Sequence, residues 1–122
     1  MIYGEVASHD FEGPADEADE GLRVAAEIGS RLCMIMRNHG LLTVGTSIAE
    51  CFNSMFRLER ACQIQVDAAA AGALNIMGDN LAAKSGADMD RFAEREATFG
   101  DLEFAAMVRK MDKEKKDPSW RN

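Results

Sequence analysis

His39 is the residue of this chain whose type and position are best suited to chemistry. It lies in the tetrapeptide Arg37-Asn38-His39-Gly40, between two short apolar runs at residues 32–36 and 41–44. Two such runs joined by a short turn with a glycine predict a β-hairpin. A histidine at the tip of a hairpin is held by a stiff frame without being packed inside it, which suits a metal-binding or acid–base imidazole. The alternative is a solvent-facing turn residue with no chemical role.

The other metal-binding side chains do not complete a site with this imidazole. The chain has only two histidines, His9 and His39, and no His-x-His sequence. A catalytic zinc site typically has three protein ligands and one open position, so a single imidazole cannot fix its geometry. The three cysteines, Cys33, Cys51 and Cys62, lack metal-ligand spacing. They are typical of buried thiols in a reducing cytoplasm.

The elements around the hairpin predict a layered α/β fold. Both hairpin runs are apolar on consecutive residues, which indicates a sheet covered on both faces by helices. Residues 2–8 predict a strand that precedes the hairpin. An acidic helix is expected from Pro14 to the stop at Gly29, and its predicted apolar side is formed by Leu22, Ala25 and Ala26.

A long helix is expected after the hairpin. Ser47 and Glu50 form a capping box, and the helix should run to about Ala71. Its predicted apolar stripe consists of Ile48, Cys51, Phe52, Met55, Leu58, Cys62 and Val66. Glu59 lies close to this stripe, where a carboxylate needs a partner. Glu59 either makes a structural hydrogen bond within the fold or supports the metal site from close by.

The C-terminal part predicts helices of less certain extent. Residues 73–87 indicate an irregular linker because they contain Gly78, Asp79, Asn80 and Gly86. Residues 88–112 indicate one or two helices, with Asp88 as a cap and a break at Gly100. The tail cannot remain helical past Pro118, and its Trp120 is either docked or free.

Composition narrows the class of protein. The chain has 122 residues, 47% of them apolar, which indicates one globular domain at most. Its formal net charge is −7, and the basic residues at 109–116 are interleaved with acids, so no nucleic-acid partner is expected. The sequence has no signal peptide and no stretch that would span a bilayer. We therefore expect a cytoplasmic protein without a membrane partner.

Residues 1–72 resemble the C-terminal part of the class II aldolase/adducin family. In that family an apolar strand ends in Asn-His-Gly, a second strand ends in Gly, and a long helix follows with a Leu-Glu pair and then Ala. The matching residues are Asn38-His39-Gly40, Gly45, and Leu58-Glu59 with Ala61. The segment from Tyr3 to Gly13 is similar to the stretch that precedes this module in bacterial adducin-like members.

The resemblance implies a three-layer α/β/α fold, truncated at its N-terminus, with residues 73–122 as a linker, helical extension and tail. It implies a divalent metal, usually zinc, held by three histidines, and His39 matches the third of these. The other two come from a His-x-His motif that this chain lacks, together with the acid/base carboxylate upstream of it. The implied parent is a metal-dependent lyase that acts on a small hydroxylated carbonyl substrate, often phosphorylated, in a homo-oligomer.

Two functions therefore remain open. The family points to an aldolase, whereas the residues present point to an incomplete site with little or no activity of its own. The alternative is a non-catalytic adducin-like interaction protein of the cytoskeletal type.

Overall fold

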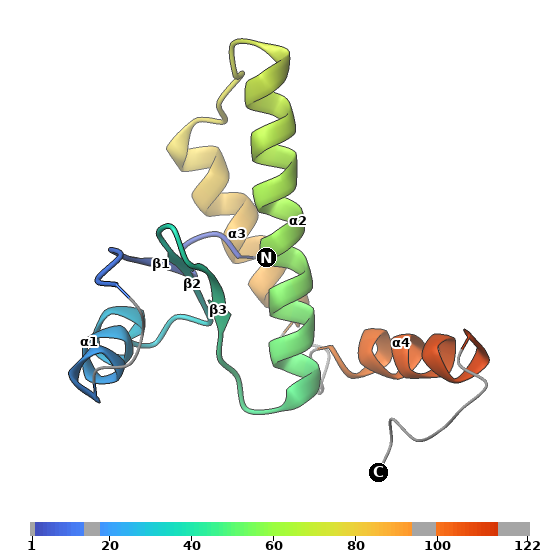
Figure 1. Cartoon of the computed structure of the whole chain (residues 1–122). Helices are drawn as coiled ribbons and strands as arrows, with labels where there is room; N and C mark the ends of the chain where they lie inside the picture. Colours follow the sequence, from blue (N-terminus) through green and yellow to red (C-terminus); the bar gives the residue numbers. More distant parts are fainter. Residues whose placement is uncertain (1, 14–17, 94–99, 115–122) are drawn as a thin grey trace.

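A computed structural model describes residues 2–13, 18–93 and 100–114 of the chain. Its centre is a three-stranded sheet in the order β1-β2-β3 (Figure 1). Strand β1 (Val6–His9) runs parallel to β2 (Cys33–Met36), and β2 runs antiparallel to β3 (Gly40–Thr43). The predicted hairpin is thus confirmed, and the first strand lies slightly later than residues 2–8.

Helix α1 (Ala18–Ile28) is the crossover between the parallel strands β1 and β2, as parallel pairing requires. It covers one face of the sheet, where Val24 and Ile28 pack against Ala7, Met34 and their neighbours. Gly29 ends the helix with φ +56°, as predicted. The predicted apolar side is wrong, because Leu22, Ala25 and Ala26 are all exposed. The proposed start at Pro14 lies outside the described residues.

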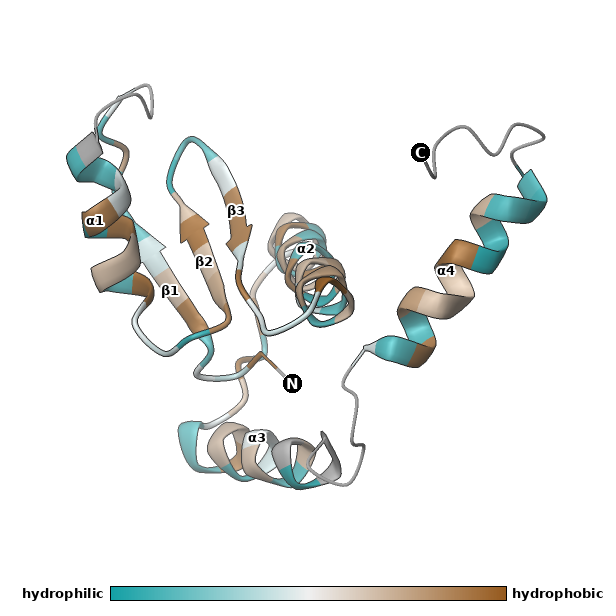
Figure 2. Ribbon diagram, turned by 90° about the horizontal axis from the view of Figure 1, so that it is seen from below, coloured by the Kyte–Doolittle hydropathy of each residue, from teal (hydrophilic) through white to brown (hydrophobic). Residues whose placement is uncertain are grey.

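Helix α2 (Ile48–Ala71) covers the opposite face, which gives three layers (Figure 2). The predicted cap is confirmed, since Ser47 Oγ accepts a hydrogen bond from Glu50 N at 3.1 Å. The Glu50 carboxylate accepts from Thr46 N at 2.6 Å. Both contacts satisfy amide groups at the start of the helix.

The apolar stripe predicted for α2 is only partly confirmed. Leu58 is fully buried, whereas both ends of the stripe, Ile48 and Val66, are exposed. The buried positions include the polar residues Asn53 and Ser54. Burial is confined to the first half of the helix, because the small sheet reaches no further along it (Figure 1).

Helices α3 (Asp79–Ala93) and α4 (Asp101–Glu114) complete the described chain. The predicted irregular linker at 73–87 is wrong beyond residue 78, and Asp88 lies inside α3 rather than at its cap. Gly78 O accepts hydrogen bonds from Leu81 N and Ala82 N, so the glycine precedes the first turn. Gly86 lies inside α3, at a position where an added Cβ would come 3.0 Å from the Tyr3 ring. The break at Gly100 is confirmed, and Trp120 lies outside the described residues.

No helix in the described part of the chain has the length and apolar character needed to span a membrane.

Candidate functional site

The candidate site is the turn that carries His39, and its backbone is well defined. Residues 37–39 form the turn between β2 and β3, and His39 N donates to Met36 O at 3.1 Å. Asn38 has φ +54°, in the left-handed region that asparagine tolerates better than most residues. The side chain of His39 is exposed at this tip. The predicted position of the imidazole is confirmed, and its role as a metal ligand stays a prediction.

The same edge of the sheet gathers further polar groups. Because β1 and β2 are parallel, their carboxyl ends lie side by side. Arg37 N donates to His9 O at 2.9 Å, which ties the turn to the end of β1. The side chains add an ion pair between Arg37 Nη1 and Asp10 Oδ1 at 3.0 Å. This exposed edge therefore presents an imidazole, a guanidinium and a carboxylate.

The donors available around His39 do not complete a metal site. Within residues 2–13, 18–93 and 100–114, no three His, Cys, Asp or Glu side chains are grouped so that they could hold a metal ion. A catalytic zinc site typically needs three protein ligands. His39 can therefore supply one donor, but the described residues do not by themselves form a complete three-ligand site.

His9 occupies a site that the sequence analysis missed. Its side chain is 2% exposed, on the same face of β1 as Ala7. Its Nδ1 donates to Glu27 Oε2 at 2.8 Å, and its Nε2 lies 3.6 Å from Glu20 Oε1. Both carboxylates come from α1, two turns apart. Side chains alternate between the two faces of a strand, so His9 must lie on the same face as the apolar Ala7. This alternation was the sequence signal for the inward position of His9.

These contacts set the charge of the His9 ring. The hydrogen bond to Glu27 raises the pKa of His9 above its ordinary value, although burial opposes this. Nearby, the Arg23 guanidinium binds the Glu12 carboxylate and lowers the pKa of Glu12. Because His9 lies in β1 and both carboxylates lie in α1, these contacts link α1 to the sheet.

Two other residues of interest lie away from this edge. Glu59 is exposed on α2, so it needs no buried partner. Cys33 is fully buried in β2, and burial raises the pKa of its thiol. It therefore behaves as a packed side chain rather than as a nucleophile or a metal ligand.

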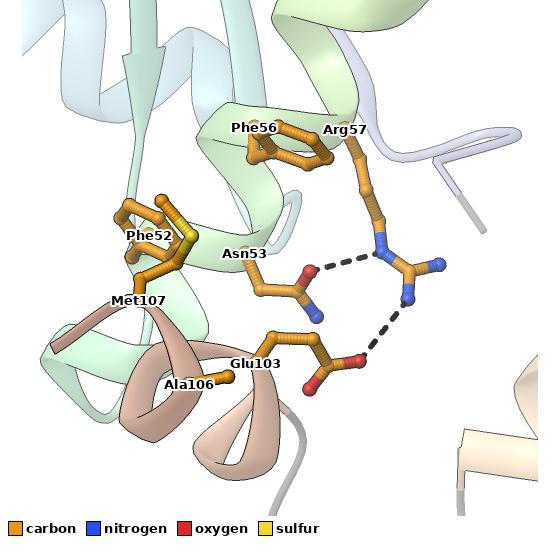
Figure 3. Close-up of a pocket in the computed structure, with 7 residues that line it drawn as sticks. All are labelled: Phe52, Asn53, Phe56, Arg57, Glu103, Ala106 and Met107. Carbon is orange, nitrogen blue, oxygen red and sulfur yellow. Dashed lines mark hydrogen bonds and ion pairs between the residues drawn. The ribbon is translucent and has the colours of Figure 1, made fainter. Parts of the chain in front are cut away.

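A groove between α2 and α4 is the second feature that the sequence analysis missed (Figure 3). It has a volume of about 430 Å³, and its lining residues are Phe52, Asn53, Phe56, Arg57, Glu103, Ala106 and Met107. Phe52 also makes an edge-to-face contact with Phe104, with ring centroids 5.5 Å apart. The sequence pattern of either helix alone could not have revealed a groove between them.

Comparison with known proteins decides the family. The family model described as "Class II Aldolase and Adducin N-terminal domain" matches residues 1–66. The chain belongs to the class II aldolase and adducin family. The resemblance inferred from the Asn-His-Gly turn is thereby confirmed.

Individual relatives agree with the class II aldolase and adducin assignment. A "Putative aldolase class 2 protein" of Caulobacter vibrioides is 36% identical over 93% of this chain and 44% of its own length. Gamma-adducin of Mus musculus is 29% identical over 92% of this chain and 18% of its own length. The chain thus spans less than half the length of these two relatives.

Solved structures confirm the α/β fold of the class II aldolases. An aldolase II superfamily protein from Pseudomonas syringae matches with a TM-score of 0.74 and 33% identity, over 93% of this chain and 44% of that one. L-fuculose 1-phosphate aldolase from Glaciozyma antarctica matches with a TM-score of 0.54 and 35% identity, over 67% of this chain and 30% of that one.

Proposed function

We propose that this chain is the His39-bearing part of a class II aldolase-type lyase that acts on a small hydroxylated carbonyl compound of the sugar-phosphate kind. The observation that carries the proposal is the exposed imidazole on a hydrogen-bonded turn, in a chain similar to L-fuculose 1-phosphate aldolase. Residues 1–72 would belong to the catalytic domain, and residues 73–122 would form its helical extension.

The role of the chain's own residues is to hold the imidazole in place. The turn between β2 and β3 fixes the backbone of His39, and the Arg37–Asp10 ion pair supports that turn from β1. We propose that His39 contributes one ligand to a divalent ion, with zinc expected. The described residues supply one such donor, so we expect little or no lyase activity from the chain alone.

The remaining expectations extend the same proposal. A full active protein would be a cytoplasmic homo-oligomer with a small-molecule substrate, and its other ligands and acid/base carboxylate would come from outside the described residues. The three free cysteines suit a reducing compartment.

The alternative function is a non-catalytic assembly role like that of the adducins. The incomplete donor set around His39 favours it, and gamma-adducin covers nearly the whole chain in alignment. The two functions differ in whether His39 binds a metal, so a metal titration separates them.

The test is a Zn²⁺ titration of the 122-residue chain, followed by NMR of the two histidine rings. We expect Zn²⁺ to shift the ring signals of His39 weakly and saturably, because the ring is exposed and has one donor to offer. In the His39→Gln variant the remaining His9 ring should not shift, whereas in His9→Gln the response of the His39 ring should persist. An unchanged His39 signal at millimolar Zn²⁺ would overturn the metal role and favour the assembly role.

A further inference from the structure

Helix α4 stands apart from the body of the molecule. It projects from the first half of α2, away from the sheet and α1 (Figures 1 and 2). At Gly100 the chain that leads into α4 approaches α2 closely, since an added Cβ would lie 2.6 Å from Ala49 O. The half-buried residues Phe104, Val108 and Met111 mark one side of α4. The adjoining side, which carries Glu103, Ala106, Met107 and Lys110, is exposed along its length.

The charges on this exposed side are ordered along the helix. Glu103 lies in the first turns and Lys110 in the last, seven residues later. Seven residues are about two turns, so both charges lie on one face, about 10 Å apart. Ala106 and Met107 lie midway between them on the same face. The acid and the base are therefore equally far from the midpoint of the face.

The face continues into the groove beside α2. There Phe52 and Phe56 of α2 line the groove opposite Ala106 and Met107 of α4, and Phe56 is about half exposed (Figure 3). At the floor of the groove Asn53 is buried, and its Nδ2 has no hydrogen-bond partner among the described residues. Its Oδ1 accepts from Arg57 Nε at 3.2 Å. An apolar groove of about 430 Å³ has room for large side chains of another molecule.

We propose that a second copy of this chain occupies the groove, with its α4 antiparallel to the first across a two-fold axis. In that arrangement Glu103 of each copy faces Lys110 of the other, and the small Ala106 faces the large Met107. A two-fold interface must be self-complementary, and a face with an acid and a base equidistant from an apolar midpoint meets this requirement. Methionine adapts well to an irregular groove.

Charge also explains why the contact would form here. The chain carries a formal net charge of −7, so most pairs of surfaces on two copies repel each other. The first turn of α4 carries Asp101 and Glu103, whereas its last turns have a small excess of positive charge, because Arg109, Lys110 and Lys113 outnumber Asp112 and Glu114. Antiparallel pairing brings opposite ends together. This inference does not depend on the proposed lyase function, because it involves no residue at the His39 edge.

The test is sedimentation velocity of the full chain over a concentration series, with circular dichroism to confirm folding. We expect a reversible dimer. Glu103→Lys and Lys110→Glu should each weaken it about tenfold or more, because the two-fold axis repeats each like-charge contact. The double variant Glu103→Lys/Lys110→Glu should restore the dimer. Only contacts between copies explain such a rescue, since neither the Arg57–Glu103 nor the Lys110–Glu114 ion pair is restored by the exchange.

Arg109→Glu is the matched control, because it makes the same charge change as Lys110→Glu about 100° away around the helix. It should leave the dimer constant within about twofold. A chain that stays monomeric at all concentrations would overturn the proposal, and so would a dimer that the charge exchange does not rescue. Those outcomes would leave the groove to a different protein or to a small molecule.

A disulfide test gives an independent readout. Ala106 and Ala105 are both exposed alanines, but only Ala106 lies on the proposed face. Under mild oxidation Ala106→Cys should form a covalent dimer well above the level of the parent chain, whose own cysteines provide the background. Ala105→Cys should not exceed that background. Equal cross-linking of the two variants would contradict the predicted pairing.

Discussion

At the scale of single residues, the contacts of His9 indicate the charge of its ring. It is buried on the α1 face of the sheet, with a carboxylate of α1 against each ring nitrogen. A protonated ring donates to Glu27 and also places its positive charge beside Glu20, whose Oε1 lies 3.6 Å from Nε2 without a hydrogen bond. The protonated form therefore fits its surroundings better, in agreement with the raised pKa of His9.

This charge state predicts a pH dependence of stability. A histidine pKa that is higher in the folded than in the unfolded chain stabilises the fold fully below about 6.5, the unfolded value. That stabilisation is lost as the pH rises through the folded pKa. We therefore expect the free energy of unfolding to decrease above pH 6.5, as measured by urea unfolding at a series of pH values.

Variants of the same cluster provide the controls. In His9→Gln the decrease above pH 6.5 should be much smaller, and Glu27→Gln should reduce it because Glu27 is the main cause of the pKa shift. Glu59→Gln makes the same change at an exposed position of α2 and should keep the parent profile. A His9→Gln variant with an unchanged profile would show that the dependence arises elsewhere.

The position of His39 could be predicted from the sequence, but the contacts of His9 with α1 could not. The turn that carries His39 is encoded locally, by apolar runs on either side of Asn38 and Gly40. The surroundings of His9 depend on Glu27, eighteen residues away, and on the way that α1 crosses the sheet. Local pattern cannot supply a contact of that range.

At the scale of elements, the close packing of the start of α4 against α2 depends on Gly100. Gly100 has φ +89°, and a Cβ there would lie 2.6 Å from Ala49 O. Both facts exclude a larger residue without strain. We expect Gly100→Ala to destabilise the protein by about 1–3 kcal/mol, measured by thermal or urea unfolding.

Gly78→Ala is the matched control for this prediction. Gly78 precedes α3, and nothing lies within 4 Å of the Cβ that would be added there. It should change the unfolding free energy by less than about 0.5 kcal/mol. Similar losses in the two variants would mean that the close approach of Gly100 to α2 does not determine stability.

The helices show where element prediction succeeds and where it fails. Both ends of α2 were predicted correctly, because a serine cap and a terminal glycine are local signals. The start of α3 was missed because Gly78, Asp79 and Asn80 are typical of loops. Gly86 also suggested a break, yet its missing side chain makes room for Tyr3. A tertiary contact thus overrides the usual cost of glycine in a helix.

At the scale of the whole molecule, buried apolar side chains are concentrated around the sheet. Ala7, Ile28 and Met34 form the centre of that core, whereas Ile64, Val66 and Ile76 are exposed on α2 and the segment after it. A protein of this kind gains stability from any contact that covers its outer helices. Association and folding should therefore be linked.

This linkage predicts that thermal stability depends on protein concentration. A dimer that forms only from folded chains raises the unfolding temperature as concentration increases. We expect the midpoint to rise by several degrees between micromolar and submillimolar protein, measured by scanning calorimetry. The Glu103→Lys variant should show a smaller rise. A midpoint independent of concentration in the parent chain would contradict the linkage.

The hydrogen bond from Arg37 N to His9 O has a consequence for both histidines. This single backbone hydrogen bond connects β1, which His9 links to α1, with the turn that carries His39. If α1 separated from the sheet, β1 would support this turn less firmly. The orientation of the His39 ring therefore depends indirectly on the proton that His9 shares with Glu27.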